Sequence, residues 1–396
     1  MKKILVIAGC IIFCLLAALM IRKALPPAEE IVYDQANKVF MVKGDVKIRR
    51  AENPSSLQDM KVSAILKKGD ILETSKDSAV EIVIGENVDK AVKLGENSRL
   101  EFQDINPAHL NLSRGKVRVT LKKLEPKSSF TVKTPTAISG ARATAWSAEV
   151  IGNKTKICVF ESDVLVRGID AAGKPNTKRY ITGEGTEREV ERGKPVSAAK
   201  KISEIDMQDW QYWDKNISFL REGKILVDDF SKKENFNNLS GPLGSWNVFY
   251  SDPNQQCKDE FTDLERVGDS GYGLKLTYDV DSPFSAYNGF FTSLMGIDLT
   301  DYRYLVFSIK GDKKAGFTTT LNIELKNKNQ IGRMSIDGIT DEWEKITVPL
   351  GQFVGINDFK DMKEFVIVFS DINATKKEGV VYIDDIYFAK PEAPGQ

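Results

Sequence analysis

The stretch FTVKTPTAISGARATAWSAEV, residues 130–150, decides the fold of the first half of this chain. Only three of its residues are charged, whereas charged residues make up 28% of the whole chain. Apolar and hydroxyl side chains dominate it, Pro135 stands in a Thr-Pro-Thr step, and Gly140 permits a bend. This pattern predicts a pair of central β-strands that are covered on both faces.

Five residues of this stretch form a candidate structural motif. Pro135 fixes its own φ and keeps Thr134 extended, and Thr136 and Thr144 belong to the hydroxyl-rich pattern. Arg142 is the unusual member, because a charged side chain in a covered strand pair needs a carboxylate or carbonyl partner. We expect a structural arginine here rather than a ligand site.

Outward from this stretch, the chain is predicted to be all-β. Short segments with alternating apolar and polar residues, each bounded by Gly, Asn, Asp or Pro, predict antiparallel strands on both sides of it. Residues 203–222 differ, since their apolar residues recur every three to five positions behind the candidate cap Ser203, and they predict a connector helix. Longer alternating strands then predict a β-sandwich jelly roll over 225–390.

Length and charge also favour two domains. The chain has 396 residues, of which 41% are hydrophobic, enough for two cores. Residues 31–200 carry 30 Lys and Arg against 22 Asp and Glu, a net charge of +8, whereas residues 225–390 carry 18 against 26, a net charge of −8. The basic part suits an anionic neighbour such as a phospholipid surface or a cell-wall polymer, although ordinary solubility charge explains both imbalances.

The N-terminus, residues 1–24, is predicted to be a transmembrane signal anchor. The run Ile4–Ile21 is uncharged and mostly apolar, and as a helix it would rise about 27 Å, close to the bilayer's roughly 30 Å. Arg22 and Lys23 follow it directly, which favours an uncleaved anchor in the inner membrane with the bulk of the chain in the periplasm. The alternative is a lipoprotein, because VIAGC resembles a lipobox with Cys10 as the lipidated residue.

The residue inventory argues against an enzyme. His109 is the single histidine, and no CxxC, HExxH or phosphate-binding glycine loop is present. A catalytic triad would have to use His109 with no supporting motif, so we interpret it as a structural or surface histidine. Cys158 is interpreted as a small buried hydrophobe and Cys257 as a loop thiol. No feature of the sequence indicates nucleic-acid binding.

The first half resembles the FecR-like domain, an all-β extracytoplasmic module, over residues 38–195. The resemblance rests on the order of its cues: the Gly69-Asp70 turn, a threonine after the next strand, an Asn-Ser turn, a Gly-Lys-Val strand and Thr-Pro-Thr-Ala. The family usually continues with Arg-Gly-Thr before a Phe-x-Val strand, whereas this chain has Ala143 in place of the glycine and Trp146 in the strand. The resemblance implies sensing or relay of signals across the cell envelope, with an envelope protein as partner.

The second half resembles the galactose-binding-like jelly rolls that include carbohydrate-binding modules. ILVDDFSKKENFNNLSGPLGSWNVF at its start and GVVYIDDIYFAK at its end carry this resemblance. It implies that the first and last strands pair, which would bring Asp228 or Asp229 near Asp384 or Asp385. Of these, Asp229 and Asp384 are the candidate ligands of a structural Ca²⁺. It also implies glycan binding by aromatic side chains, for which the candidates are Trp246, Tyr250, Tyr272, Tyr287 and Trp343.

Together these features predict a membrane-anchored extracytoplasmic binding protein. The jelly roll is expected to engage a glycan or glycoconjugate, and the FecR-like part is expected to contact envelope partners. Two alternatives remain open at this point: a transmembrane signal relay of the FecR type, and a purely structural envelope scaffold.

Overall fold

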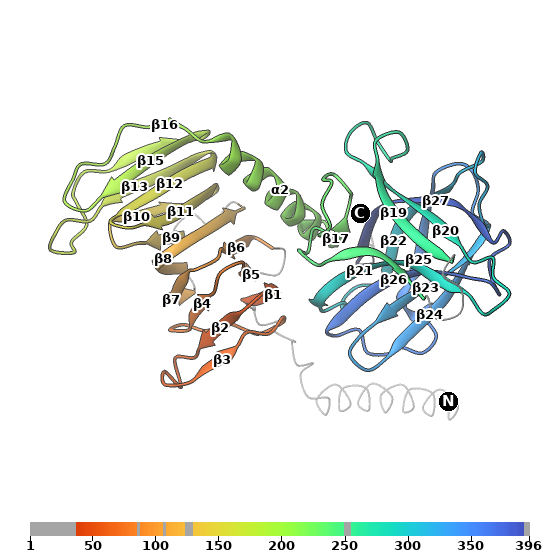
Figure 1. Cartoon of the computed structure of the whole chain (residues 1–396). Helices are drawn as coiled ribbons and strands as arrows, with labels where there is room; N and C mark the ends of the chain where they lie inside the picture. Colours follow the sequence, from red (N-terminus) through yellow and green to blue (C-terminus); the bar gives the residue numbers. More distant parts are fainter. Residues whose placement is uncertain (1–36, 85–87, 106–107, 123–129, 249–254, 392–396) are drawn as a thin grey trace, which may run out of the picture. The chain divides into compact units, whose positions relative to one another are not determined.

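The computed structural model describes residues 37–84, 88–105, 108–122, 130–248 and 255–391. The predicted anchor, residues 1–24, lies outside these ranges. Within them, no helix is both long enough and apolar enough to cross a membrane. Strands account for most of the described residues, so the prediction of an all-β chain is confirmed (Figure 1).

The first lobe consists of sixteen hydrogen-bonded strands, arranged as two layers that share the long strand β8. One layer contains β1 (Lys38–Lys43), β5 (Ala79–Ile84), β6 (Lys90–Leu94), the second half of β8 (Ala108–Leu121), β11 (Ala145–Ile151), β12 (Lys154–Glu161), β15 (Thr186–Glu191) and β16 (Lys200–Lys201). The other contains β2 (Val46–Arg49), β3 (Leu57–Asp59), β4 (Ile71–Thr74), β7 (Arg99–Ile105), the first half of β8, β9 (Phe130–Lys133), β10 (Ala137–Ala141), β13 (Asp163–Gly168) and β14 (Tyr180–Gly183).

Strand β8 passes from one layer to the other at Gly115. This residue has a φ of +82°, and a Cβ there would overlap the side chain of Ser98. Glycine is therefore the residue that allows both the bend and the close approach.

The opening stretch forms β9, β10 and β11 in the middle of this lobe. Phe130 of β9 and Trp146 of β11 meet edge to face with ring centroids 5.8 Å apart, and both side chains are fully buried. Because these strands belong to different layers, the contact joins the two layers across the core. The Trp146 Nε1–H donates to Ser139 Oγ at 3.1 Å, so the indole nitrogen keeps a partner.

The two threonines of the Thr-Pro-Thr step form a buried hydroxyl cluster. Thr134 Oγ1 and Thr136 Oγ1 each lie 2.7 Å from Thr155 Oγ1, and Thr136 also donates to the Val190 carbonyl at 2.9 Å. This cluster ties the β9–β10 turn to β12 and β15. In the same motif, Thr144 donates to the carbonyl of Glu161.

Our expectation for Arg142 is wrong. It is an exposed residue in the turn that follows β10, not a member of a covered strand. Strand β10 ends at Ala141, just before it, so the side chain reaches solvent and needs no buried partner.

The predicted connector helix is confirmed as α2 (Glu204–Arg221). Ser203 caps it by accepting a hydrogen bond from the Asp206 N–H at 3.2 Å. The helix buries Trp210 and Trp213, and the Trp210 ring stacks on Phe160 of β12 with centroids 4.9 Å apart. The aromatic stripe is therefore a packing face that covers the outer side of the first layer.

The second lobe is a two-sheet antiparallel jelly roll. One sheet contains β17 (Lys224–Asp228), β19 (Gln256–Thr262), β20 (Gly273–Asp279), β22 (Tyr304–Gly311), β25 (Glu344–Pro349) and β27 (Glu378–Ala389). The other contains β18 (Leu243–Asn247), β21 (Tyr287–Ile297), β23 (Thr320–Lys326), β24 (Ile331–Asp337) and β26 (Met362–Ser370), and the short 3-10 helix η1 (Leu350–Gln352) follows β25.

The core of this lobe lies between the two sheets. Tyr278 of β20 stacks on Phe369 of β26 with centroids 4.2 Å apart, and Phe307 of β22 meets Phe365 of β26 at 5.7 Å. The first and last strands pair as expected, with Ile225 opposite Phe388.

Of the two cysteines in the described residues, Cys158 is fully buried, as predicted. The interpretation of Cys257 as a loop thiol is wrong, because this residue lies in β19 and is only 1% exposed.

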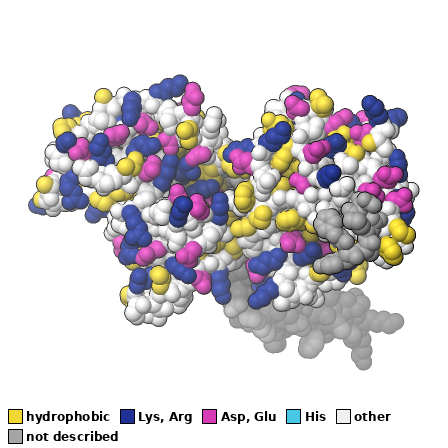
Figure 2. All heavy atoms as spheres, viewed as in Figure 1, with side chains coloured by type: hydrophobic (Ala, Val, Ile, Leu, Met, Phe, Trp, Pro, Cys, Tyr) yellow, Lys and Arg dark blue, Asp and Glu magenta, His cyan; other side chains and the backbone are white. Residues whose placement is uncertain are grey.

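On the face seen in Figure 2, basic and acidic side chains are interspersed over both lobes. The opposite net charges of the two halves therefore do not produce two single-sign surfaces there.

Candidate functional site

The outer face of the five-stranded sheet carries a groove with a volume of about 400 Å³. Alternate residues of each strand point into the core, such as Phe290 and Phe365, so the residues between them face solvent. The strand order β18-β21-β26-β23-β24 then sets the sequence of side chains across the groove. Its lining residues are Trp246, Tyr287, Phe291, Glu324, Lys326, Arg333, Glu364, Val366 and Val368.

One end of the groove is aromatic. Trp246 of β18 and Tyr287 of β21 lie with ring centroids 6.0 Å apart and ring planes at 58°, and Tyr287 is 45% exposed. Trp246 lies opposite Gly289 in the sheet, where an added Cβ would approach Trp246 Cζ2 to 3.3 Å. Because Gly289 has no side chain, the indole ring of Trp246 can lie beside its backbone.

The middle of the groove is apolar. Phe291 of β21 lies opposite Val366 of β26, and Val368 lies opposite Gly289, so these side chains form a continuous floor between the aromatic end and the far strands. Gly244 of β18 lies opposite Phe291 and leaves its ring uncovered on that side.

The other end of the groove is charged. Arg333 Nε donates to Glu324 Oε1 at 2.9 Å, and Lys326 Nζ lies 3.2 Å from Glu364 Oε2 and 3.6 Å from Glu324 Oε2. Two carboxylates and two cations thus hold one another in fixed positions and have no net charge. Such a network offers both hydrogen-bond acceptors and donors to the hydroxyl groups of a ligand.

Two parts of the chain match known protein families. Residues 70–165 match the family described as FecR protein, and residues 242–390 match the family described as carbohydrate binding domain 30. One part of the chain thus matches FecR domains and another matches carbohydrate-binding domains, and the two lobes are called the FecR domain and the carbohydrate-binding domain after these matches. Both matched families consist of non-catalytic domains. Among proteins with curated descriptions, none matches this chain.

Solved structures similar to the chain include a carbohydrate-binding module and a putative anti-sigma factor. The family 11 carbohydrate-binding module of Clostridium thermocellum, in complex with a β-1,3-1,4-mixed-linked tetrasaccharide, is 19% identical with a TM-score of 0.33, over 42% of this chain and 96% of that module. A putative anti-sigma factor from Parabacteroides distasonis ATCC 8503 is 9% identical with a TM-score of 0.29, over 40% of this chain and 68% of that protein.

The structure brings together two of the five aromatic residues that the sequence suggested, Trp246 and Tyr287. Tyr272 lies at the start of β20 in the other sheet, where it meets Phe261 edge to face at 6.5 Å. Trp343 immediately precedes β25, also in that sheet, and is half-buried. Tyr250 lies outside the described residues.

Sequence reasoning missed the charged end of the groove in the carbohydrate-binding domain. Glu324, Arg333 and Glu364 come from three strands, and each is an ordinary polar residue in an alternating pattern. A usable signal was Arg333, seven residues after Lys326 across a hairpin, since hairpin pairing places it opposite Glu324. The pairing of β23 with β26, which brings Glu364 next to Lys326, has no local signal.

A second feature of the carbohydrate-binding domain is a group of acidic residues where β17 meets β27. Asp228 and Asp384 are both buried, and burial raises the pKa of each carboxyl to about 7. Asp384 accepts hydrogen bonds from the Val267 and Asp385 N–H groups, each at 2.8 Å. Both strands have an irregular register here, and Asp385 has a φ of +49°.

These residues fit a hard cation, with one change in the expected set. Asp229, the predicted partner of Asp384, forms an ion pair with Lys215 of α2. Asp228 instead lies near enough to Asp384 that, after burial, the charge of Asp384 raises the pKa of Asp228. Carboxylate oxygens are ligands that Ca²⁺ prefers.

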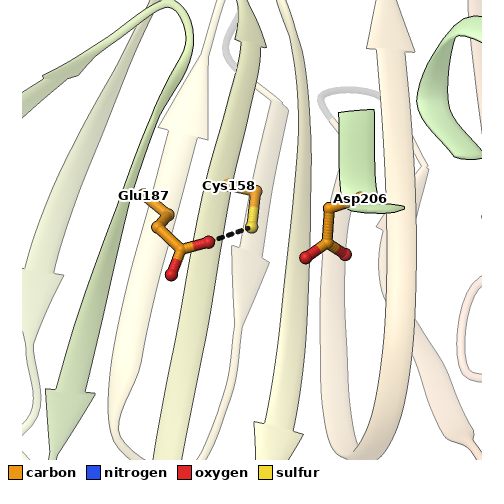
Figure 3. Close-up of side chains that lie close together, drawn as sticks. All are labelled: Cys158, Glu187 and Asp206. Carbon is orange, nitrogen blue, oxygen red and sulfur yellow. Dashed lines mark hydrogen bonds between the residues drawn. The ribbon is translucent and has the colours of Figure 1, made fainter. Parts of the chain in front are cut away.

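A third group, Cys158, Glu187 and Asp206, offers ligand atoms within 4.8 Å of one another (Figure 3). Lysines already balance its carboxylates: Lys116 and Lys156 lie 2.6 and 2.9 Å from Asp206. Burial raises the pKa of the Cys158 thiol to about 12, which keeps it protonated. The group therefore acts as an ion-pair cluster under α2, not as a metal centre.

The single histidine belongs to the FecR domain. His109 lies in β8, and its Nδ1 is 2.5 Å from the Oγ1 of Thr131 in the neighbouring parallel strand β9.

Proposed function

We propose that the carbohydrate-binding domain holds a glycan chain in the groove of its five-stranded sheet. The observation that carries the proposal is that the aromatic end, with half-buried Trp246 and exposed Tyr287, lies on the same face as an ion-paired, hydrogen-bonding end. The family match over residues 242–390 supports the same ligand class.

Each part of the groove has a role in this proposal. The Tyr287 ring and the half-buried Trp246 ring, which both line the groove, pack against the apolar C–H face of a pyranose, which removes apolar surface from water. Glu324 accepts hydrogen bonds from sugar hydroxyls, and the free nitrogens of the Arg333 guanidinium donate to them. From β18 to β24 the groove crosses four inter-strand spacings, about 19 Å, which suits an oligosaccharide rather than a single sugar.

Isothermal titration of the full chain with soluble glycans tests the proposal. The panel includes a mixed-linked β-glucan, a xyloglucan, a galactan and a peptidoglycan fragment. We expect one of these to bind, and Tyr287→Ala and Trp246→Ala to weaken binding at least about tenfold because truncating an aromatic anchor in a binding site is costly. Trp343→Ala is the matched control, since that side chain lies by the other sheet.

Two results count against the proposal. One is the absence of binding across the panel by a chain whose circular dichroism shows folded strands. The other is binding that Trp343→Ala weakens as much as Tyr287→Ala does.

We further propose that Asp228 and Asp384 hold a structural Ca²⁺, with Asp229 contributing only if Lys215 releases it. The ion would supply the positive charge that this buried pair lacks. Chelator treatment of the purified chain, followed by addition of Ca²⁺, is expected to lower and then restore the melting temperature. An unchanged transition in both steps would exclude the ion.

The proposed location is the periplasmic face of the inner membrane. The apolar run Ile4–Ile21 would anchor the chain, and lipidation of Cys10 is the alternative means of attachment. Intact mass spectrometry of the membrane-extracted protein separates the two, because lipidation adds acyl mass and removes the residues before Cys10. Recovery of the unmodified full-length chain from the soluble fraction would contradict both.

Signal relay remains a second candidate, and contacts of α2 favour it over a passive scaffold. The helix bonds the FecR domain through Asp206 and contacts the carbohydrate-binding domain through Lys215 and Tyr212. A glycan that changes amide hydrogen exchange in α2 would support relay. If glycan binding does not change amide hydrogen exchange in α2 and in the FecR domain, the protein acts as an anchored binding protein without signal relay.

A further inference from the structure

A second groove lies on the FecR domain, on the outer face of strands β9, β10, β13 and β14. Its volume is about 540 Å³. Val164 and Val166 of β13 are buried in the core, so Asp163, Leu165 and Arg167 of the same strand face outward. The lining residues are Thr131, Ile138, Gly140, Ala141, Arg142, Asp163, Val164, Leu165, Arg167, Arg179 and Ile181.

An apolar row runs across the centre of this groove. Leu165 lies opposite Gly140 on one side and opposite Ile181 on the other. Leu165 is 38% exposed and Ile181 is 68% exposed, which is unusual for large aliphatic side chains on adjacent strands. Gly140 has no side chain, so the row begins in a depression of the sheet.

Arginines lie on both sides of the apolar row. Arg142 follows Gly140 by two residues, and Arg167 follows Leu165 by two residues in the antiparallel strand, so they flank the row from opposite directions. Arg179 precedes β14 on the same side as Arg167. Against these three cations the lining has one carboxylate, Asp163.

Two of these arginines have no ionic partner in the described part of the chain. Arg142 and Arg179 are both exposed and form no ion pair there, whereas Arg167 Nε donates to the Asn176 carbonyl at 2.9 Å. Guanidinium groups beside an apolar row favour a ligand that combines carboxylates with apolar side chains.

The same domain already shows what covers such a face. On the outer side of the other layer, α2 packs Trp210 on Phe160, while its Asp206 and Asp209 meet basic residues of β8 and β12. An acidic amphipathic helix therefore covers a basic and apolar sheet face in this fold. The groove of β10, β13 and β14 has no corresponding helix among the described residues.

We propose that this groove is a docking surface for an acidic amphipathic helix of a partner protein. Arg167 lies two residues along β13 from Leu165, about 6.6 Å from the row, and Arg142 lies just beyond the end of β10 on the other side of the row. A helix with side chains is about 10–12 Å wide, which places its apolar stripe on Leu165 and Ile181 and carboxylates of both flanks near the arginines. A hollow of this form suits a helix better than a flat bilayer. The proposal does not depend on glycan binding.

Fluorescence anisotropy with the full chain and synthetic helices tests it. One labelled peptide carries leucines at three- and four-residue spacing with glutamates on both flanks, and the matched peptide carries lysines in their place. We expect the glutamate peptide to bind and the lysine peptide not to bind. The variant Arg142→Glu/Arg179→Glu is expected to weaken binding of the glutamate peptide at least about tenfold, because it reverses charge on both sides of the row.

Two further variants separate docking from general charge. Ile181→Ser is expected to weaken the same peptide several-fold through lost apolar contact. Lys174→Glu, an exposed position outside the groove, is expected to leave binding unchanged. All of these side chains are exposed, so melting temperatures should stay close to that of the parent chain.

Three outcomes would overturn the proposal: equal affinity of both peptides, equal affinity of the parent chain and the double arginine variant, or a matching loss in Lys174→Glu. Vesicles of phosphatidylcholine and phosphatidylglycerol provide the last arm. If they bind the parent chain, lose binding in the arginine variant and displace the glutamate peptide, the groove recognises an anionic lipid surface instead of a helix.

Discussion

Trp246 and Gly289 are cross-strand partners on the outer face of the five-stranded sheet, and the missing side chain of Gly289 makes room for the indole. The same glycine also lies against the neighbouring strand, because an added Cβ would overlap the Ile367 carbonyl oxygen. One residue therefore controls both the aromatic end of the groove and the pairing of β21 with β26.

Gly289→Ala is expected to lower the free energy of unfolding by about 1–3 kcal/mol, since the overlap involves backbone that can move only with its strand. Denaturant unfolding followed by tryptophan fluorescence measures this. Gly351→Ala is the control, because no atom lies within 4 Å of its added Cβ. Equal stability of the two variants would show that β26 tolerates the shift.

Glu324→Gln is expected to weaken glycan binding about three- to tenfold with little change in melting temperature. The substitution keeps the size of the side chain but removes the charge that holds Arg333, so this donor loses its fixed position, whereas Lys326 keeps its closer partner Glu364. Titration with the glycan found in the panel measures it. Glu342→Gln, an exposed substitution just before β25, should bind as the parent chain does.

The buried pair Asp228 and Asp384 predicts a specific pH dependence of stability. Burial raises the pKa of both carboxyls to about 7, whereas an unfolded aspartate titrates near about 3.9. The folded chain therefore holds protons that the unfolded chain has lost, and this contribution to the free energy of unfolding falls as the pH rises from about 4 to about 7. Above pH 7 it stays constant.

In the presence of chelator, the melting temperature of the parent chain is expected to fall between pH 5 and pH 8. Asp384→Asn is expected to make this fall smaller, because the amide has no charge to bury. It should also remove the response to Ca²⁺ at pH 8. Differential scanning calorimetry checks both effects, with Asp281→Asn, an exposed change, as the control. A variant that loses as much melting temperature as the parent chain would refute the assignment.

Asp206 is expected to hold α2 on the FecR domain. Its pKa is lowered, since hydrogen bonds from Lys116 and Lys156 outweigh the opposing effect of burial, so its contribution is present above about pH 4 and is lost as the pH falls further. Asp206→Asn leaves Lys116 and Lys156 with only their longer contacts to Glu149, at 3.7 and 3.6 Å, and should cost about 2–4 kcal/mol at pH 7.

The matched substitution is Asp209→Asn in the same helix. Asp209 is 54% exposed and pairs only with Arg118, so its loss should cost about 0.5 kcal/mol. Native-state hydrogen exchange of the α2 backbone amides measures the effect of both substitutions. Similar protection in the two would mean that the Trp210 and Trp213 packing alone fixes the helix.

The two cysteines of the described residues are expected to be unreactive in the folded chain. Burial raises the pKa of the Cys158 thiol to about 12 and also raises that of Cys257. At pH 8 a thiol reagent should label neither within minutes, and both should react in denaturant. Peptide mapping by mass spectrometry distinguishes these sites from Cys10 and Cys14. Rapid native labelling of Cys257 would contradict its place in β19.

Local patterns predicted the elements of this fold well. The alternation around β9 to β11 and the apolar spacing in α2 both led to the observed structures, because each depends on neighbours within a few residues. The errors for Arg142 and Cys257 have one cause. Whether a residue next to a turn is covered depends on where the strand ends, and that end is set by its partners in the sheet.

Side-chain periodicity along the chain was enough to predict strand-built lobes joined by a helix, since it fixes which face of each element is apolar. The resemblance to carbohydrate-binding modules also indicated Trp246 and Tyr287 as candidates. Three contacts became known from the folded arrangement alone: Trp246 meets Tyr287, Glu364 lies beside Lys326, and Arg142 and Arg179 flank one apolar row. Each of these contacts joins strands far apart in the chain, and strand order in a sheet is settled by packing of the whole core rather than by local sequence.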